Sequence, residues 1–102
     1  MEQMLKRAEE SGLPYLAYSW TDHTGQHGRA WVPLVHTYGK GAPIAKKDIT
    51  GWIRSLKTRY GTFDHLTVVV KFTGLTWVQE QNVRSAMTAG WPYVWEHTEV
   101  VP

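Results

Sequence analysis

The strand-forming run from Leu66 to Thr73, LTVVVKFT, restricts the fold more than any other segment of the chain. It contains three consecutive valines, Val68 to Val70, and β-branched residues favour extended backbone. Because successive side chains of a strand point to opposite faces of the sheet, adjacent valines need apolar cover on both faces. We therefore predict a central strand here, covered by helices.

Apolar spacing predicts the remaining elements. Helices are expected at residues 2–11, 49–60 and 77–89, where apolar side chains recur at i, i+3 and i+4, and further strands at 15–21, 30–38 and 91–101. A chain of 102 residues has room for one core. We expect a single compact α+β domain over residues 1–102, in the order αββαβαβ. Its four-stranded sheet should be largely antiparallel or mixed, with the helices mainly on one face.

Prolines and caps refine these boundaries. Thr76 and Gln79 have the spacing of a capping box, and Gly90 is expected to cap the end of the same helix. Pro33 lacks an amide donor, so its strand should lie at an edge of the sheet or contain a bulge. Pro92 is expected as the first residue of the last strand for the same reason.

Composition excludes several classes of protein. The chain has no cysteine, which rules out disulfide frameworks, cysteine-ligated zinc, iron–sulfur clusters and thiol nucleophiles. No apolar run approaches the roughly 18 residues of a membrane helix, and the N-terminal segment carries acids where a signal peptide needs basic and then apolar residues. We therefore expect a cytoplasmic protein without membrane contact, metal or cofactor. The net charge of +2 permits a nucleic-acid partner without requiring one.

The segment WTDHTGQHGRAW, residues 20–31, predicts a β-hairpin. Gly25 suits the first central position of a two-residue type II′ turn. Counting outward from that turn pairs Asp22 with Arg29 and Trp20 with Trp31, and both are favourable cross-strand pairs. The same alternation places the two histidines of the segment, His23 and His27, on opposite faces, which disfavours a shared metal ion.

The other histidines are isolated in the sequence. His36 is expected opposite Tyr15, as a hydrogen-bonded pair, and His65 follows Asp64 on a strand, where neighbours face oppositely. The serines and glycines form no nucleophile or phosphate-binding motif. We therefore expect no enzymatic activity, with a small hydrolase that uses His36 or His65 as an alternative.

Six tryptophans are the outlier in the composition. Trp52 is expected in the core and Trp77 over the start of a helix. If Trp20 and Trp31 lie on an uncovered face of the sheet, they form an exposed aromatic patch, which is typical of an interaction site. We predict a non-enzymatic module that binds a protein partner through the hairpin. The predicted contact residues are Tyr18, Trp20, Asp22, His27, Arg29 and Trp31.

A basic helix supports the main alternative, nucleic-acid binding. Its candidate residues are Lys46, Lys47, Arg54, Lys57 and Arg59. Such residues are also typical of the solvated face of an amphipathic helix. A homodimer formed through the hairpin is a further alternative. A cysteine-free, tryptophan-rich chain of this length resembles, in composition alone, the small accessory proteins of bacteriophages.

Overall fold

The computed structural model describes residues 2–36 and 42–102, and its elements follow the predicted order with two short 3₁₀ helices added. The predicted connector at 39–43 and the end of the predicted strand 30–38 lie partly outside the described residues. The elements are α1 (Glu2–Glu10), β1 (Tyr15–Asp22), β2 (His27–Pro33), α2 (Lys46–Arg59), η1 (Tyr60–Thr62), β3 (Phe63–Lys71), α3 (Trp77–Gly90), η2 (Pro92–His97) and β4 (Thr98–Val101).

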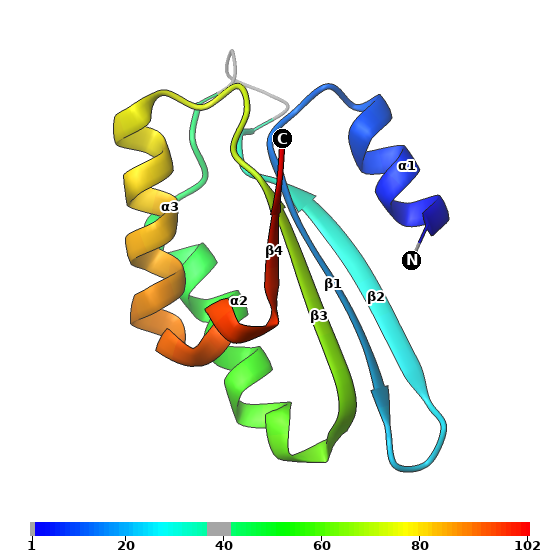
Figure 1. Cartoon of the computed structure of the whole chain (residues 1–102). Helices are drawn as coiled ribbons and strands as arrows, with labels where there is room; N and C mark the ends of the chain where they lie inside the picture. Colours follow the sequence, from blue (N-terminus) through cyan, green and yellow to red (C-terminus); the bar gives the residue numbers. More distant parts are fainter. Residues whose placement is uncertain (1, 37–41) are drawn as a thin grey trace.

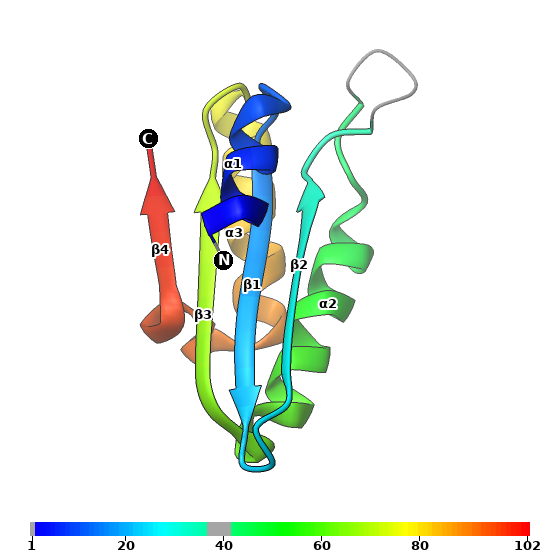
Figure 2. The same ribbon diagram turned by 90° about the vertical axis from the view of Figure 1, so that its right-hand side faces the viewer.

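The four strands form one mixed sheet with the order β2-β1-β3-β4. β1 pairs antiparallel with both β2 and β3, whereas β4 runs parallel to β3. Helices α2 and α3 pack on one face of this sheet, and α1 lies on the other (Figures 1 and 2). The predicted α+β class, with helices mainly on one face, is therefore confirmed.

β3 occupies the central position predicted from its valines, although it begins at Phe63 and ends at Lys71. Val68 and Val70 are fully buried in the main core, where they meet Ile53 of α2 and Met87 of α3. Val69 faces the other way, into a smaller cluster beneath α1. Burial of each such side chain stabilises the fold by roughly 1.5 to 3 kcal/mol, which makes β3 the principal contributor from the sheet.

The hairpin register differs from the prediction. β1 and β2 place Trp20 opposite Gly28, three positions before the predicted partner Trp31. A register shift by an odd number of residues moves the side chains of one strand to the other face relative to its neighbour. The two indoles therefore lie on opposite faces of the sheet. The predicted Asp22–Arg29 pair is likewise wrong, because Asp22 is bound to the turn.

The turn explains this register. The amide of Asp22 donates to the carbonyl of Gln26 at 2.9 Å, and the amide of Gly25 donates to the carbonyl of Asp22 at 3.2 Å. Gly25 has a φ of 85°. This is a three-residue loop, a type I turn followed by a glycine with positive φ, in place of the predicted two-residue turn.

The prolines behave differently at the two predicted positions. Pro33 ends β2, an edge strand, as predicted. Pro92, however, begins the 3₁₀ helix η2 and not a strand, and only residues from Thr98 onward join the sheet. Proline has a fixed φ that suits the first turn of a helix, which accounts for this correction.

Helix α3 begins as predicted, with both hydrogen bonds of the capping box between Thr76 and Gln79. Its end is different, because Gly90 is still helical and Trp91 is the capping residue. A Cβ at Gly90 would lie 2.7 Å from the carbonyl oxygen of Thr50 and 2.8 Å from Cβ of Ile53. Gly90 therefore allows the close approach of α3 to α2.

Glu9 connects α1 to the sheet through both carboxylate oxygens. Tyr15 Oη donates to Oε1 at 2.8 Å and Lys71 Nζ donates to Oε2 at 2.7 Å. The bond from Lys71, with the one from Tyr15, lowers the pKa of Glu9. Burial, with the bond to Glu9, raises the pKa of Tyr15 to about 12.

Candidate binding groove

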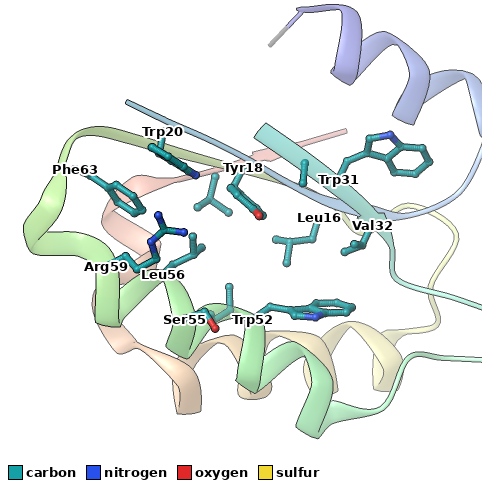
Figure 3. A pocket seen from close by; sticks show the side chains of 13 residues that line it. Leu16, Tyr18, Trp20, Trp31, Val32, Trp52, Ser55, Leu56, Arg59 and Phe63 are labelled. Atoms are coloured by element: carbon teal, nitrogen blue, oxygen red, sulfur yellow. The ribbon is translucent and has the colours of Figure 1, made fainter. Parts of the chain in front are cut away.

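An open apolar groove lies between the sheet and α2, on the side of the edge strand β2 (Figure 3). Its volume is about 260 Å³. We call it the β2–α2 groove. Its lining residues are Leu16, Tyr18, Trp20, Ala30, Trp31, Val32, Trp52, Ile53, Ser55, Leu56, Arg59, Phe63 and Val68.

The floor of the groove depends on a small residue in β2. Gly28 lies opposite Trp20, and a Cβ there would be 2.5 Å from Cε2 of the indole. The Trp20 ring therefore lies directly against the backbone of β2. Ala30, the next residue on the same face, also leaves space in front of Tyr18.

Aromatic rings and a guanidinium group form one end of the groove. Trp20 stacks on Phe63 with a centroid distance of 5.1 Å and an interplanar angle of 21°. The Arg59 guanidinium carbon lies 5.1 Å from the Trp20 ring centre and 5.8 Å from that of Phe63. These contacts hold a positive charge beside an apolar surface, where it can meet a carboxylate of a ligand.

Trp52 and Val32 form the other end. Both are half-buried and pack against the main core. Trp52 was predicted to be a core residue; it contacts the core and also lines the groove (Figure 3). A large amphipathic ring in this position can bury further surface when a partner covers it.

The helix that borders the groove is basic. Along α2 the acidic side chain is Asp48, against a larger set of bases. These bases are Lys46, Lys47, Arg54, Lys57 and Arg59. Within the described residues, those on α2 form no ion pair. One wall of the groove therefore belongs to a helix of net positive charge.

The predicted hairpin contact residues do not form one patch. Tyr18 and Trp20 line the groove. Arg29 and Trp31 point to the opposite face, where they lie near Met4 of α1. Trp31 borders the groove, but its indole is directed toward α1 (Figure 3).

The other two predicted hairpin residues lie near the turn. Asp22 Oδ1 accepts hydrogen bonds from the amides of Thr24 and Gln26, both at 2.9 Å, and from Thr24 Oγ1 at 2.7 Å. The Thr24 hydroxyl bond is the largest cause of the lowered pKa of Asp22. Asp22 therefore stabilises the turn. His27 is exposed at the start of β2.

The predicted nucleic-acid residues all lie on α2 and are exposed. They are Lys46, Lys47, Arg54, Lys57 and Arg59. Arg59 is the member that lines the groove. The helix thus presents the predicted positive surface, and its apolar residues Ile49, Ile53 and Leu56 enter the core.

The histidines are dispersed. His65 Nε2 lies 2.9 Å from Thr67 Oγ1, on the same strand. His36 is exposed, and its predicted partner Tyr15 donates to Glu9 instead, so that pairing is wrong. His23 Nδ1 contacts Asp64 Oδ1, which links the hairpin loop to the start of β3.

Several groove residues were not predicted from the sequence. Phe63 was not a predicted site residue, and Arg59 was predicted only as a nucleic-acid contact. Phe63 begins β3 and Arg59 ends α2, and the tertiary fold brings both to Trp20. The role of Gly28 could have been predicted, because a glycine inside a strand often marks a place where another group packs closely against the backbone. Trp77, predicted to cover a helix start, is instead 74% exposed.

Comparison of the chain with models of known protein families, with curated proteins and with solved structures finds no match. None of the helices in the described part of the chain combines the length and apolarity of a membrane span. The function is therefore inferred from the groove itself.

Proposed function

We propose that the protein is a binding module that receives bulky apolar side chains of a protein partner in the β2–α2 groove. The observation that carries this proposal is an open groove lined by Tyr18, Trp20, Trp52 and Phe63 beside exposed bases. Partly exposed aromatic pockets of this kind are where partner side chains contribute most binding energy.

The dimensions of the groove favour a protein partner over a small molecule. Its volume of about 260 Å³ is below the roughly 300 to 1,000 Å³ of typical small-molecule sites. Few polar groups converge on it: the Ser55 hydroxyl already donates to the carbonyl of Gly51 at 3.1 Å. A space of this kind suits one or two apolar side chains, and the bases around it suit acidic neighbours in the partner.

A matched pair of phenylalanine variants tests the proposal. Ala30→Phe places a phenyl ring in the groove, whereas Thr21→Phe adds the same ring on the opposite face of the sheet, at an exposed position of β1. The probe is a display library of random peptides of about 12 residues, long enough for an extended or helical segment. We expect peptides selected on the native protein to bind the Thr21→Phe variant and to lose binding to Ala30→Phe.

Two results contradict the proposal. In one, the library yields no peptide that binds the native protein. In the other, the selected peptides bind Ala30→Phe as well as they bind Thr21→Phe, while circular dichroism shows both variants folded.

The exposed bases of α2 favour nucleic-acid binding as a second candidate. If they lie along phosphates, Lys47→Glu, Arg54→Glu and Lys57→Glu together should abolish binding of a single-stranded DNA measured by fluorescence anisotropy. Binding by the native protein should then weaken steeply as salt is raised, because counterion release drives it. Absence of any DNA binding at low salt removes this candidate.

Three further predictions concern properties other than the groove: a hydrolase that uses His36 or His65, a bacteriophage accessory role, and a cytoplasmic location. The groove proposal depends on none of them.

A further inference from the structure

We infer that the partner enters as an extended acidic segment that adds a strand to the outer edge of β2 and directs alternate apolar side chains into the groove. This inference rests on the proposed function and specifies the partner's conformation and charge.

In the described part of the chain, the outer edge of β2 is free for a further strand. β2 ends the sheet, and within residues 2–36 and 42–102 no strand pairs with its outer side. An unpaired edge presents backbone donors and acceptors that an extended peptide can use. β2 lies at the edge of the sheet (Figure 2), and the groove is lined by residues of this same strand (Figure 3), so one segment can reach both.

The hydrogen-bond pattern identifies which backbone groups are available. The amide of Leu34 donates to the carbonyl of Pro14 at 2.8 Å, and the amide of Asp22 donates to the carbonyl of Gln26 at 2.9 Å. In an antiparallel ladder hydrogen-bonded pairs alternate with non-bonded pairs. The even-numbered residues of β2 therefore bond to β1, and the odd-numbered residues direct their amides and carbonyls outward. The outward residues with amides are His27, Arg29 and Trp31.

Pro33 continues this odd-numbered series and has no amide. It costs the β1–β2 ladder no hydrogen bond at that position, because its nitrogen belongs to the outer edge. It also ends the row of outward donors. A partner segment is therefore expected to pair with the stretch from His27 to Trp31.

The faces of β2 determine the pattern of the partner's side chains. Ala30 and Val32 face the groove, whereas the alternate residues Arg29 and Trp31 face α1. Because an added strand continues the pleat of the sheet, every second partner side chain points toward the groove. We therefore expect the apolar residues of the partner segment at every second position.

The positive charges near β2 favour an acidic partner over a second copy of the chain. A β2–β2 pairing of two copies would place Arg29 and the α2 bases of one copy near those of the other. Like charges in such positions are unfavourable. An acidic segment instead meets Arg29 on one side of the new strand and Arg59 beside the groove on the other.

Backbone methylation tests the inference on the peptide that the library enriches most. We expect N-methylation, introduced at one position at a time, to weaken binding about tenfold or more at alternate positions and little at the positions between, because only alternate amides bond to β2. If N-methylation weakens binding at consecutive positions and not at alternate ones, strand addition is overturned. If the same peptide still fails to bind Ala30→Phe, the groove proposal survives that result.

A variant of the protein tests the same hydrogen bonds from the other side. Arg29→Pro removes an outward amide but no bond to β1, and Arg29→Ala is its control for the loss of charge. Weaker peptide binding to Arg29→Pro than to Arg29→Ala is expected, and equal binding contradicts the inference.

The acidic character of the partner is tested separately. The enriched peptides should be rich in Asp and Glu, and replacement of these by Asn and Gln should weaken binding. Neutral peptides that bind as tightly as the acidic ones would overturn the acidic character of the partner. Light scattering that shows a dimer, which Ala30→Phe dissociates, would assign the groove to a second copy and overturn the acidic segment.

Discussion

Gly28 shows how one residue determines the shape of the groove. The indole of Trp20 occupies the space where any larger residue would place its Cβ. Trp20 can therefore stack on Phe63 while leaving room in front of Ala30. The position of an aromatic wall thus depends on a residue that contributes no side chain.

Gly28→Ala should lower stability by about 1 to 3 kcal/mol, the usual cost of overpacking, because the indole must move and its stack on Phe63 is disturbed. Gly51→Ala is a matched control: it lies in α2 with no atom near the added Cβ. It should raise stability by up to about 1 kcal/mol through helix propensity. Urea unfolding measures both. Equal effects of the two substitutions would contradict the close packing of Trp20 on β2.

At the scale of elements, local patterns were predictable and long-range pairings were not. The Val68–Val70 run and the Thr76 capping box carry their information within a few residues, and both predictions were confirmed. Gly25, in contrast, suits either a two-residue or a three-residue loop. The Asp22 carboxylate, which accepts three hydrogen bonds within the loop, stabilises the three-residue form.

The attachment of α1 should depend on pH. Glu9 has a lowered pKa in the folded protein, so its stabilising contribution is complete above its ordinary value of 4.5 and is lost as the pH falls through the folded-state value. Glu9→Gln should therefore be less stable than the native protein at neutral pH, and this difference should shrink on acidification. Urea unfolding at several pH values measures it.

Glu10→Gln is the control for this prediction, because Glu10 is exposed and neighbours Glu9 in the same helix. It should cost little stability at neutral pH, because Tyr15 and Lys71 bind Glu9. A Glu9→Gln difference that stays constant from neutral pH to well below 4.5 would show that the Lys71 and Tyr15 contacts do not stabilise the charged carboxylate.

The approach of α2 to α3 depends on Gly90. Gly90→Ala should destabilise the protein by about 1 to 3 kcal/mol, because the new methyl group would meet the backbone at Thr50, which cannot rotate away. Thermal unfolding, compared with Gly51→Ala, measures the effect. A Gly90→Ala protein as stable as the native one would contradict this helix contact.

At the scale of the whole molecule, the groove combines residues that no local pattern connects. Tyr18 and Trp20 come from β1, Ala30 from β2, Arg59 from α2 and Phe63 from β3. The sequence predicted a binding patch with Trp20 opposite Trp31, but the register pairs Trp20 with Gly28 and separates the two indoles. The basic surface was predictable because it lies along one helix, whereas the groove beside it requires the tertiary structure.

The indole N–H resonances of the six tryptophans provide the most direct test of the groove as the binding site. Trp20 and Trp52 line the groove, whereas Trp77 and Trp95 are not among its lining residues. On titration of isotope-labelled protein with the selected peptide, we expect the resonances of Trp20 and Trp52 to shift, with those of Trp77 and Trp95 unchanged. Shifts confined to Trp77 or Trp95, with Trp20 and Trp52 unmoved at saturation, would contradict binding in the β2–α2 groove.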